Sequence, residues 1–122
     1  MIYADLTIGE KELKLRLDAR NCVSLEKKLG KSPLDIFMDG DDSLPKLEEL
    51  ITVLQASLQK YESGYTVEKT YDLYDDYIEA GNTFTDFIPV IMNIFEISGF
   101  FKKGDLEKAK AEEEKKQIAV VE

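Results

Sequence analysis

The hydrophobic pattern of the chain changes its period once, near Asp18, and this change limits the folds that the sequence can adopt. Before that point apolar and polar residues alternate, first in Ile2–Ile8 and again in Glu12–Leu17, on either side of a turn that contains Gly9. Alternation with a period of two places every second side chain on one face of a strand, so these segments predict a β-hairpin. After Asp18 the apolar residues recur at spacings of three and four, which is typical of amphipathic helices.

Five helical segments are expected after the hairpin, over residues 19–29, 33–38, 45–60, 67–80 and 86–101. Asp18 and Thr66 are suitable N-caps, whereas Gly30 and Gly81 suit the position just after a helix. Pro45 suits the first turn of its helix, and Pro89 indicates that the last helix begins near residue 86. This last helix is the most apolar, so we expect it to be the central helix of the core. The helix before it is expected to present Val67, Tyr71, Tyr74 and Ile78 on one side and its carboxylates elsewhere.

The predicted fold is mainly α with a short N-terminal β-hairpin, and it belongs to the α+β class. A length of 122 residues suits one domain. We expect a compact helical domain over residues 1–101, with the hairpin in 2–17 and the helical body in 18–101. Residues 102–122 are charged and have no apolar stripe, so they are expected to form a flexible or helical tail.

The composition argues against several classes of function. The chain carries 25 Asp and Glu against 16 Lys and Arg, a net charge of −9, and it has no His. Negative charge disfavours binding to nucleic-acid phosphates and to anionic membranes. The lack of His removes the commonest general base and the commonest metal ligand. We therefore predict no enzymatic activity, no catalytic residues, no cofactor and no metal site.

Two local features invite a chemical role but lack the required partners. The acids of Asp39–Asp42 surround a glycine, yet their spacing does not match the ligand positions of a calcium-binding EF-hand loop. Cys22 has no His to activate it, so we expect it to be a small core residue. A single cysteine and the absence of an apolar signal segment predict a cytoplasmic, non-membrane protein.

The acidity of the chain is concentrated in one part of it. Residues 61–101 contain 8 acids and a single base, Lys69, which is a net charge of −7 out of −9. Tyrosines are interleaved with these carboxylates, and such residues either border the core or form a binding surface for a basic or amphipathic partner. Both interpretations remain open from the sequence. If the surface binds a partner, the expected contact residues are Tyr71, Asp72, Tyr74, Asp75, Asp76, Tyr77, Phe100 and Phe101.

The order of the elements resembles a known family. A hairpin at Leu6–Leu15 is followed by Arg20–Leu29, then Gly30–Phe37, then Leu47–Leu58. This succession is similar to that of the tail assembly chaperones of long, non-contractile-tailed phages and prophages, especially those of Gram-positive hosts. The resemblance covers about residues 6–103 and depends on overall pattern, because the family has no catalytic signature.

The resemblance implies a non-enzymatic role in the host cytoplasm, in a protein that is absent from the mature virion. Its partners would be the helical tape-measure protein and the major tail protein. Many members are also made in a longer, frameshifted form, and Glu112–Lys116 could be encoded by an A-rich slippery stretch; a purely solubilising tail remains the alternative. Two other functions stay open. One is an acidic inhibitor that mimics nucleic acid and blocks a host DNA-binding protein. The other is a structural tail component that assembles into rings, as a homo-oligomer, through the free edges of the hairpin.

Overall fold

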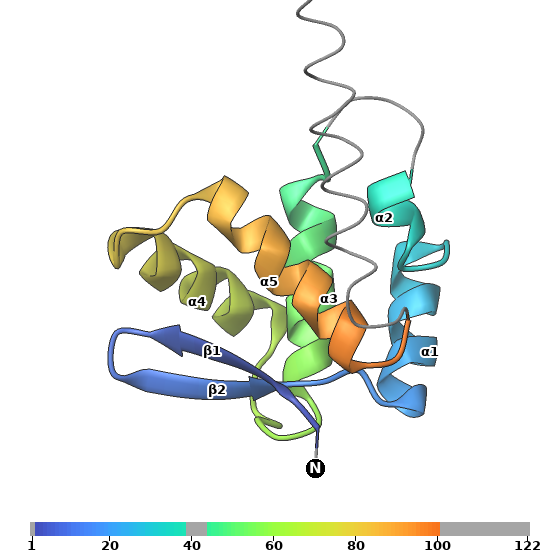
Figure 1. Cartoon of the computed structure of the whole chain (residues 1–122). Coiled ribbons are helices and arrows are strands. Elements are labelled where there is room, and N and C mark those ends of the chain that lie inside the picture. Colours follow the sequence, from blue (N-terminus) through green and yellow to red (C-terminus); the bar gives the residue numbers. More distant parts are fainter. Residues whose placement is uncertain (1, 39–43, 101–122) are drawn as a thin grey trace, which may run out of the picture.

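The computed structural model describes residues 2–38 and 44–100, in which a β-hairpin precedes five helices (Figure 1). In chain order the elements are β1 (Ala4–Ile8), β2 (Lys11–Leu15), α1 (Ala19–Leu29), α2 (Asp35–Met38), α3 (Leu47–Leu58), α4 (Val67–Glu79) and α5 (Phe84–Ile97). This arrangement confirms the predicted α+β fold. In Figure 1 the hairpin lies below α4, and α1 and α4 lie on opposite sides of α3. The predicted tail and the Asp39–Asp42 loop fall outside the described residues.

The hairpin presents one apolar face to the helices. Its strands pair antiparallel, with Leu6 opposite Leu13 and Ala4 opposite Leu15, and all four of these residues are buried. Gly9 forms the turn with a φ of 61°, a conformation that glycine adopts without strain. The strands are shorter than predicted at their open end. There the backbone N–H of Arg16 donates to the carbonyl of Ser57 at the end of α3, 2.9 Å away, instead of continuing the ladder.

The central helix is α3, and the prediction that α5 would hold this position was wrong. α3 contacts α1, α4, α5 and β2, and eight of its residues are buried, against four in α5. The buried set includes Gln55 and Ser57, which the sequence pattern counts as polar and therefore as exposed. Ser57 satisfies its own hydroxyl by donating to the carbonyl of Leu54 at 2.8 Å. Because its polar groups find partners inside the fold, α3 can be covered on nearly all sides.

The helix ends follow the predicted caps in most places. The Asp18 side chain accepts a hydrogen bond from the N–H of Asn21 at 2.9 Å, and Gly30 ends α1 with a φ of 71°. Two helix starts differ from the prediction. Pro45 precedes α3, whose N-cap is Lys46. α5 begins at Phe84, because Thr83 and Asp86 form a reciprocal capping box with bonds of 3.2 and 2.9 Å.

Candidate binding surface

The start of α4 is held in place by side chains at the end of α3, one in the helix and one at its C-cap. The side-chain amides of Gln55 and Gln59 donate to the carbonyl of Tyr65, at 3.2 and 2.9 Å. One residue later, the Thr66 hydroxyl accepts a hydrogen bond from the N–H of Lys69 at 3.2 Å and caps the helix. These contacts determine where α4 begins and in which direction it leaves α3.

The inward side of α4 carries Tyr74 and Tyr77, which pack against Phe87 of α5. Ring centroids lie 5.0 Å apart for Tyr74 and Phe87, and 5.6 Å apart for Tyr77 and Phe87. The two tyrosines are only 8% and 5% exposed. Burial, together with the charge of Asp75, raises the pKa of Tyr74; burial and the charge of Asp86 raise the pKa of Tyr77. Tyr74 and Tyr77 are therefore core residues, and their predicted place on the binding surface is wrong.

Three large apolar side chains of α4 face outward instead. Val67, Tyr71 and Ile78 are 45%, 37% and 39% exposed. At about 100° per residue they fall within about 40° of one another around the helix axis, so they form one continuous apolar stripe. The prediction placed them on one side of α4 together with Tyr74, and of these four only Tyr74 is buried. The inward side carries Thr70 as well, fully buried, with its hydroxyl donating to the carbonyl of Thr66 at 2.7 Å.

Next to the apolar stripe, α4 carries a row of exposed carboxylates that we call the acidic flank. Its members are Glu68, Asp72, Asp75 and Glu79. Within residues 2–38 and 44–100, none of these four side chains forms an ion pair or a hydrogen bond. Asp76 differs, because it pairs with Lys11 of the hairpin at 3.6 Å and so links α4 to that element. The predicted contact residues Asp72 and Asp75 thus lie together on the acidic flank, and Asp76 lies at its edge.

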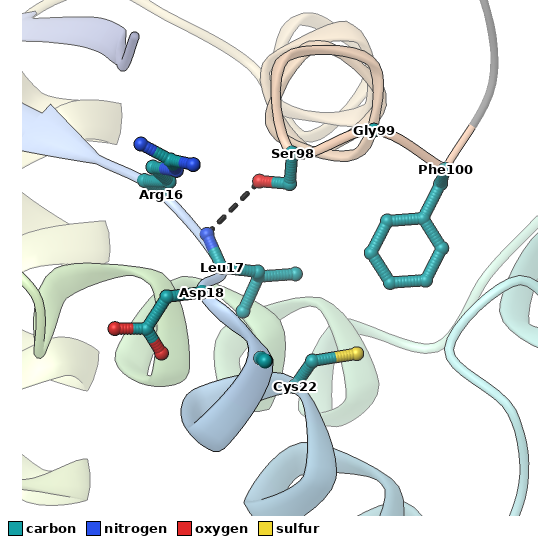
Figure 2. Close-up of a pocket in the computed structure, with 8 residues that line it drawn as sticks. Arg16, Leu17, Asp18, Cys22, Ser98, Gly99 and Phe100 are labelled. Carbon is teal, nitrogen blue, oxygen red and sulfur yellow. Dashed lines mark hydrogen bonds between the residues drawn. The ribbon is translucent and has the colours of Figure 1, made fainter. Parts of the chain in front are cut away.

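Phe100 does not lie with the α4 residues. Its ring packs on Phe95, with centroids 5.0 Å apart, and it borders a cleft beside the start of α1 (Figure 2). The cleft is closed on one side by a hydrogen bond of 2.9 Å from the N–H of Leu17 to the hydroxyl of Ser98. Phe101, the other aromatic residue predicted to bind, lies outside the described residues. The structure therefore does not place Phe100 on the same surface as the acidic flank.

The same cleft contains Cys22. Burial raises the pKa of the Cys22 thiol, and the neighbouring Glu26 carboxylate raises it further while accepting its hydrogen bond at 3.8 Å. A thiol in such surroundings stays protonated near neutral pH and is a poor nucleophile. The side-chain Nε of Arg16, another residue of this cleft, is buried and has no hydrogen-bond partner among residues 2–38 and 44–100.

The exposed acids of the described part of the chain do not converge on a point. Among residues 2–38 and 44–100, no group of three or more His, Cys, Asp or Glu is placed to hold a metal ion. The acidic flank is therefore an extended row along one helix.

Across the same residues, no helix has the length and apolarity needed to cross a membrane.

Comparison with known proteins identifies a family but no function. A family model described as a family of unknown function (DUF6096) matches residues 3–122, nearly the whole chain. No curated protein and no solved structure matches the chain.

Proposed function

The chain belongs to the DUF6096 family, and because the function of that family is unknown, we propose one from the surface of the molecule. The protein is a non-enzymatic assembly chaperone of phage tails. In the host cytoplasm it binds the helical tape-measure protein and helps to recruit the major tail protein, and it is absent from the finished virion. The order of its elements supports this assignment through the resemblance described above.

The observation that carries the proposal is the acidic flank of α4. Four carboxylates lie along three turns of one helix, and none forms an ion pair within the described residues. Like charges in a row repel one another, which is unfavourable for an isolated helix. A partner that supplies Lys or Arg along the same line relieves this repulsion and is steered toward the surface by its charge.

The acidic flank also lies on a helix whose position is fixed by other elements. Gln55 and Gln59 hold the start of α4, and Phe87 packs on its inward side; an exposed ion pair also joins Asp76 to Lys11. A binding surface that is already ordered loses little conformational entropy when a partner docks. This arrangement suits a protein that must bind an aggregation-prone client quickly.

The direct test is co-expression with a fragment of the tape-measure protein encoded in the same genome. We expect the fragment to remain in the supernatant and to co-purify with the chain. If the fragment precipitates to the same extent with and without the chain, the proposed function is wrong.

A matched pair of variants tests whether the acidic flank carries the interaction. The triple variant Asp72→Asn, Asp75→Asn, Glu79→Gln should bind the fragment more weakly and with a smaller dependence on salt. The control variant removes three exposed acids from other elements: Asp5→Asn, Asp35→Asn and Glu48→Gln. Both variants change the net charge by the same amount. Equal losses of binding would show that net charge alone acts, and would remove the assignment to α4.

A further inference from the structure

We infer that α4 binds one amphipathic helix of the partner, which lies along the apolar stripe and turns a row of Lys or Arg toward the acidic flank. The inference rests on the proposed function, since it describes the segment that the chaperone holds. It goes further by assigning the anchors to Val67, Tyr71 and Ile78, with exposed fractions of 45%, 37% and 39%.

The shape of the apolar stripe favours a helix as the bound element. From Val67 to Ile78 the stripe spans about 16 Å, or three helical turns, and it is only one side chain wide. A narrow, straight apolar line of this length matches the stripe of a second helix packed against it. A β-sheet face or an extended loop would cover a broader or a less regular area.

The charges restrict the partner further, because only one border of the stripe is acidic. On that border lie Asp75 and the rest of the acidic flank, and on the other border lies Tyr74, which is buried. A docked helix brings the carboxylates closer to apolar surface, and an unpaired carboxylate loses hydration there. A partner with Lys or Arg on the facing side compensates for this loss. The partner helix is therefore basic along one border of its apolar stripe, and its other border needs no charge.

A second copy of the chain could also bind the apolar stripe of α4, because its α1 is basic and exposed. There Arg20 and Lys27 lie beside Val23, which is 50% exposed. Val23 is, however, the only large apolar side chain that α1 exposes, so α1 could fill one of the three anchor positions. A client helix with a full apolar stripe fits the surface better than α1 does.

The test uses the full-length protein and a synthetic helical peptide, so it does not need the tape-measure protein. The probe is a capped, fluorescently labelled peptide about four turns long, with Leu at positions that match the stripe and Lys along one border. One control peptide has the same composition in an order that gives no apolar face, and the other has Glu in place of Lys. We expect only the first peptide to bind, as measured by fluorescence anisotropy. Equal binding of all three peptides would overturn the inference.

Two variants locate the peptide on the surface. Tyr71→Ala removes the central anchor and should raise the Kd by about tenfold, a change typical of an interface anchor. Val23→Ala removes an apolar side chain of α1 that is more exposed than Tyr71, and it should leave the Kd unchanged. Both positions are exposed, so both variants should keep the far-UV circular dichroism of the parent. A Kd that responds to Val23→Ala and not to Tyr71→Ala would place the binding site elsewhere and refute the assignment.

Sedimentation analysis of the pure protein tests the alternative occupant. We expect a single species at the chain mass of 13.9 kDa over the concentrations used for peptide binding. The inference would be overturned if the parent protein formed a larger species and both the Tyr71→Ala and the Val23→Ala variant sedimented at the chain mass. That result would show that a second copy binds the apolar stripe. Peptide binding at α4 with no binding of the tape-measure fragment would instead refute the proposed function and leave the inference intact.

Discussion

On α4, Tyr77 is buried and Tyr71 is partly exposed. Replacing each by alanine should therefore lower the free energy of unfolding by very different amounts. Tyr77 is 5% exposed, and its ring lies 5.6 Å from that of Phe87 and 6.3 Å from that of Tyr74. Truncating a buried aromatic side chain to alanine costs about 3–5 kcal/mol, including about 0.5–1.5 kcal/mol for its ring contacts. Tyr71 is 37% exposed, and a partly exposed side chain of this kind contributes about 1 kcal/mol. Tyr77→Ala should therefore destabilise the fold by at least about 2 kcal/mol more than Tyr71→Ala.

Urea unfolding followed by far-UV circular dichroism measures this difference, because the chain has no Trp to serve as a fluorescent reporter. A small domain has a total stability of about 5–15 kcal/mol, so Tyr77→Ala should shift the urea midpoint strongly. The corresponding drop in Tm is about 10 °C or more, against about 4–8 °C for Tyr71→Ala. Equal shifts in the two variants, or the larger shift in Tyr71→Ala, would refute the orientation of α4 described above.

Three further predictions use the same unfolding measurement. Burial raises the pKa of Tyr74 and of Tyr77, so the native state holds these protons more tightly than the unfolded state. The free energy of unfolding should therefore be unchanged below the tyrosine pKa of the unfolded state, about 10, and should fall as the pH rises above it. Tyr77→Phe should make this alkaline loss smaller. Thr83→Ala removes the capping box of α5 and should cost about 1 kcal/mol, whereas Ser24→Ala on the exposed side of α1 should change little. Gly30→Ala should cost about 1 kcal/mol, because the residue has a φ of 71°.

The features that could be predicted from the sequence are those that depend on neighbours in the chain. The hairpin follows from alternation across the turn at Gly9, and α1 follows from Asp18 and Gly30 at its two ends. Each of these signals is a backbone requirement met within a few residues, so no information about distant contacts is needed. The capping box at Thr83 is equally local, and it could have been recognised from Asp86 three residues later.

The features that the sequence did not predict depend on contacts between distant elements. Gln55 is buried in α3 because Lys28 of α1 donates to its side-chain oxygen at 3.0 Å and the carbonyl of Tyr65 accepts from its amide at 3.2 Å. Nothing in the local pattern of α3 indicates either partner. The separation of Phe100 from α4 has the same origin, since the hydrogen bond between Leu17 and Ser98 brings the end of α5 to the start of α1.

The outward apolar face of α4 carries information about function. The spacing of Val67, Tyr71 and Ile78 has the regularity of a buried face, but the inward position is filled by other residues of α4 that pack on Phe87. The helix therefore has two faces suited to burial, and the fold of this chain covers one of them. An exposed apolar stripe lowers solubility, and here it lies beside carboxylates that form no ion pair in the described part of the chain. A second polypeptide with an apolar stripe and a basic border resolves both costs in a single contact, which is why we assign this face of α4 to binding.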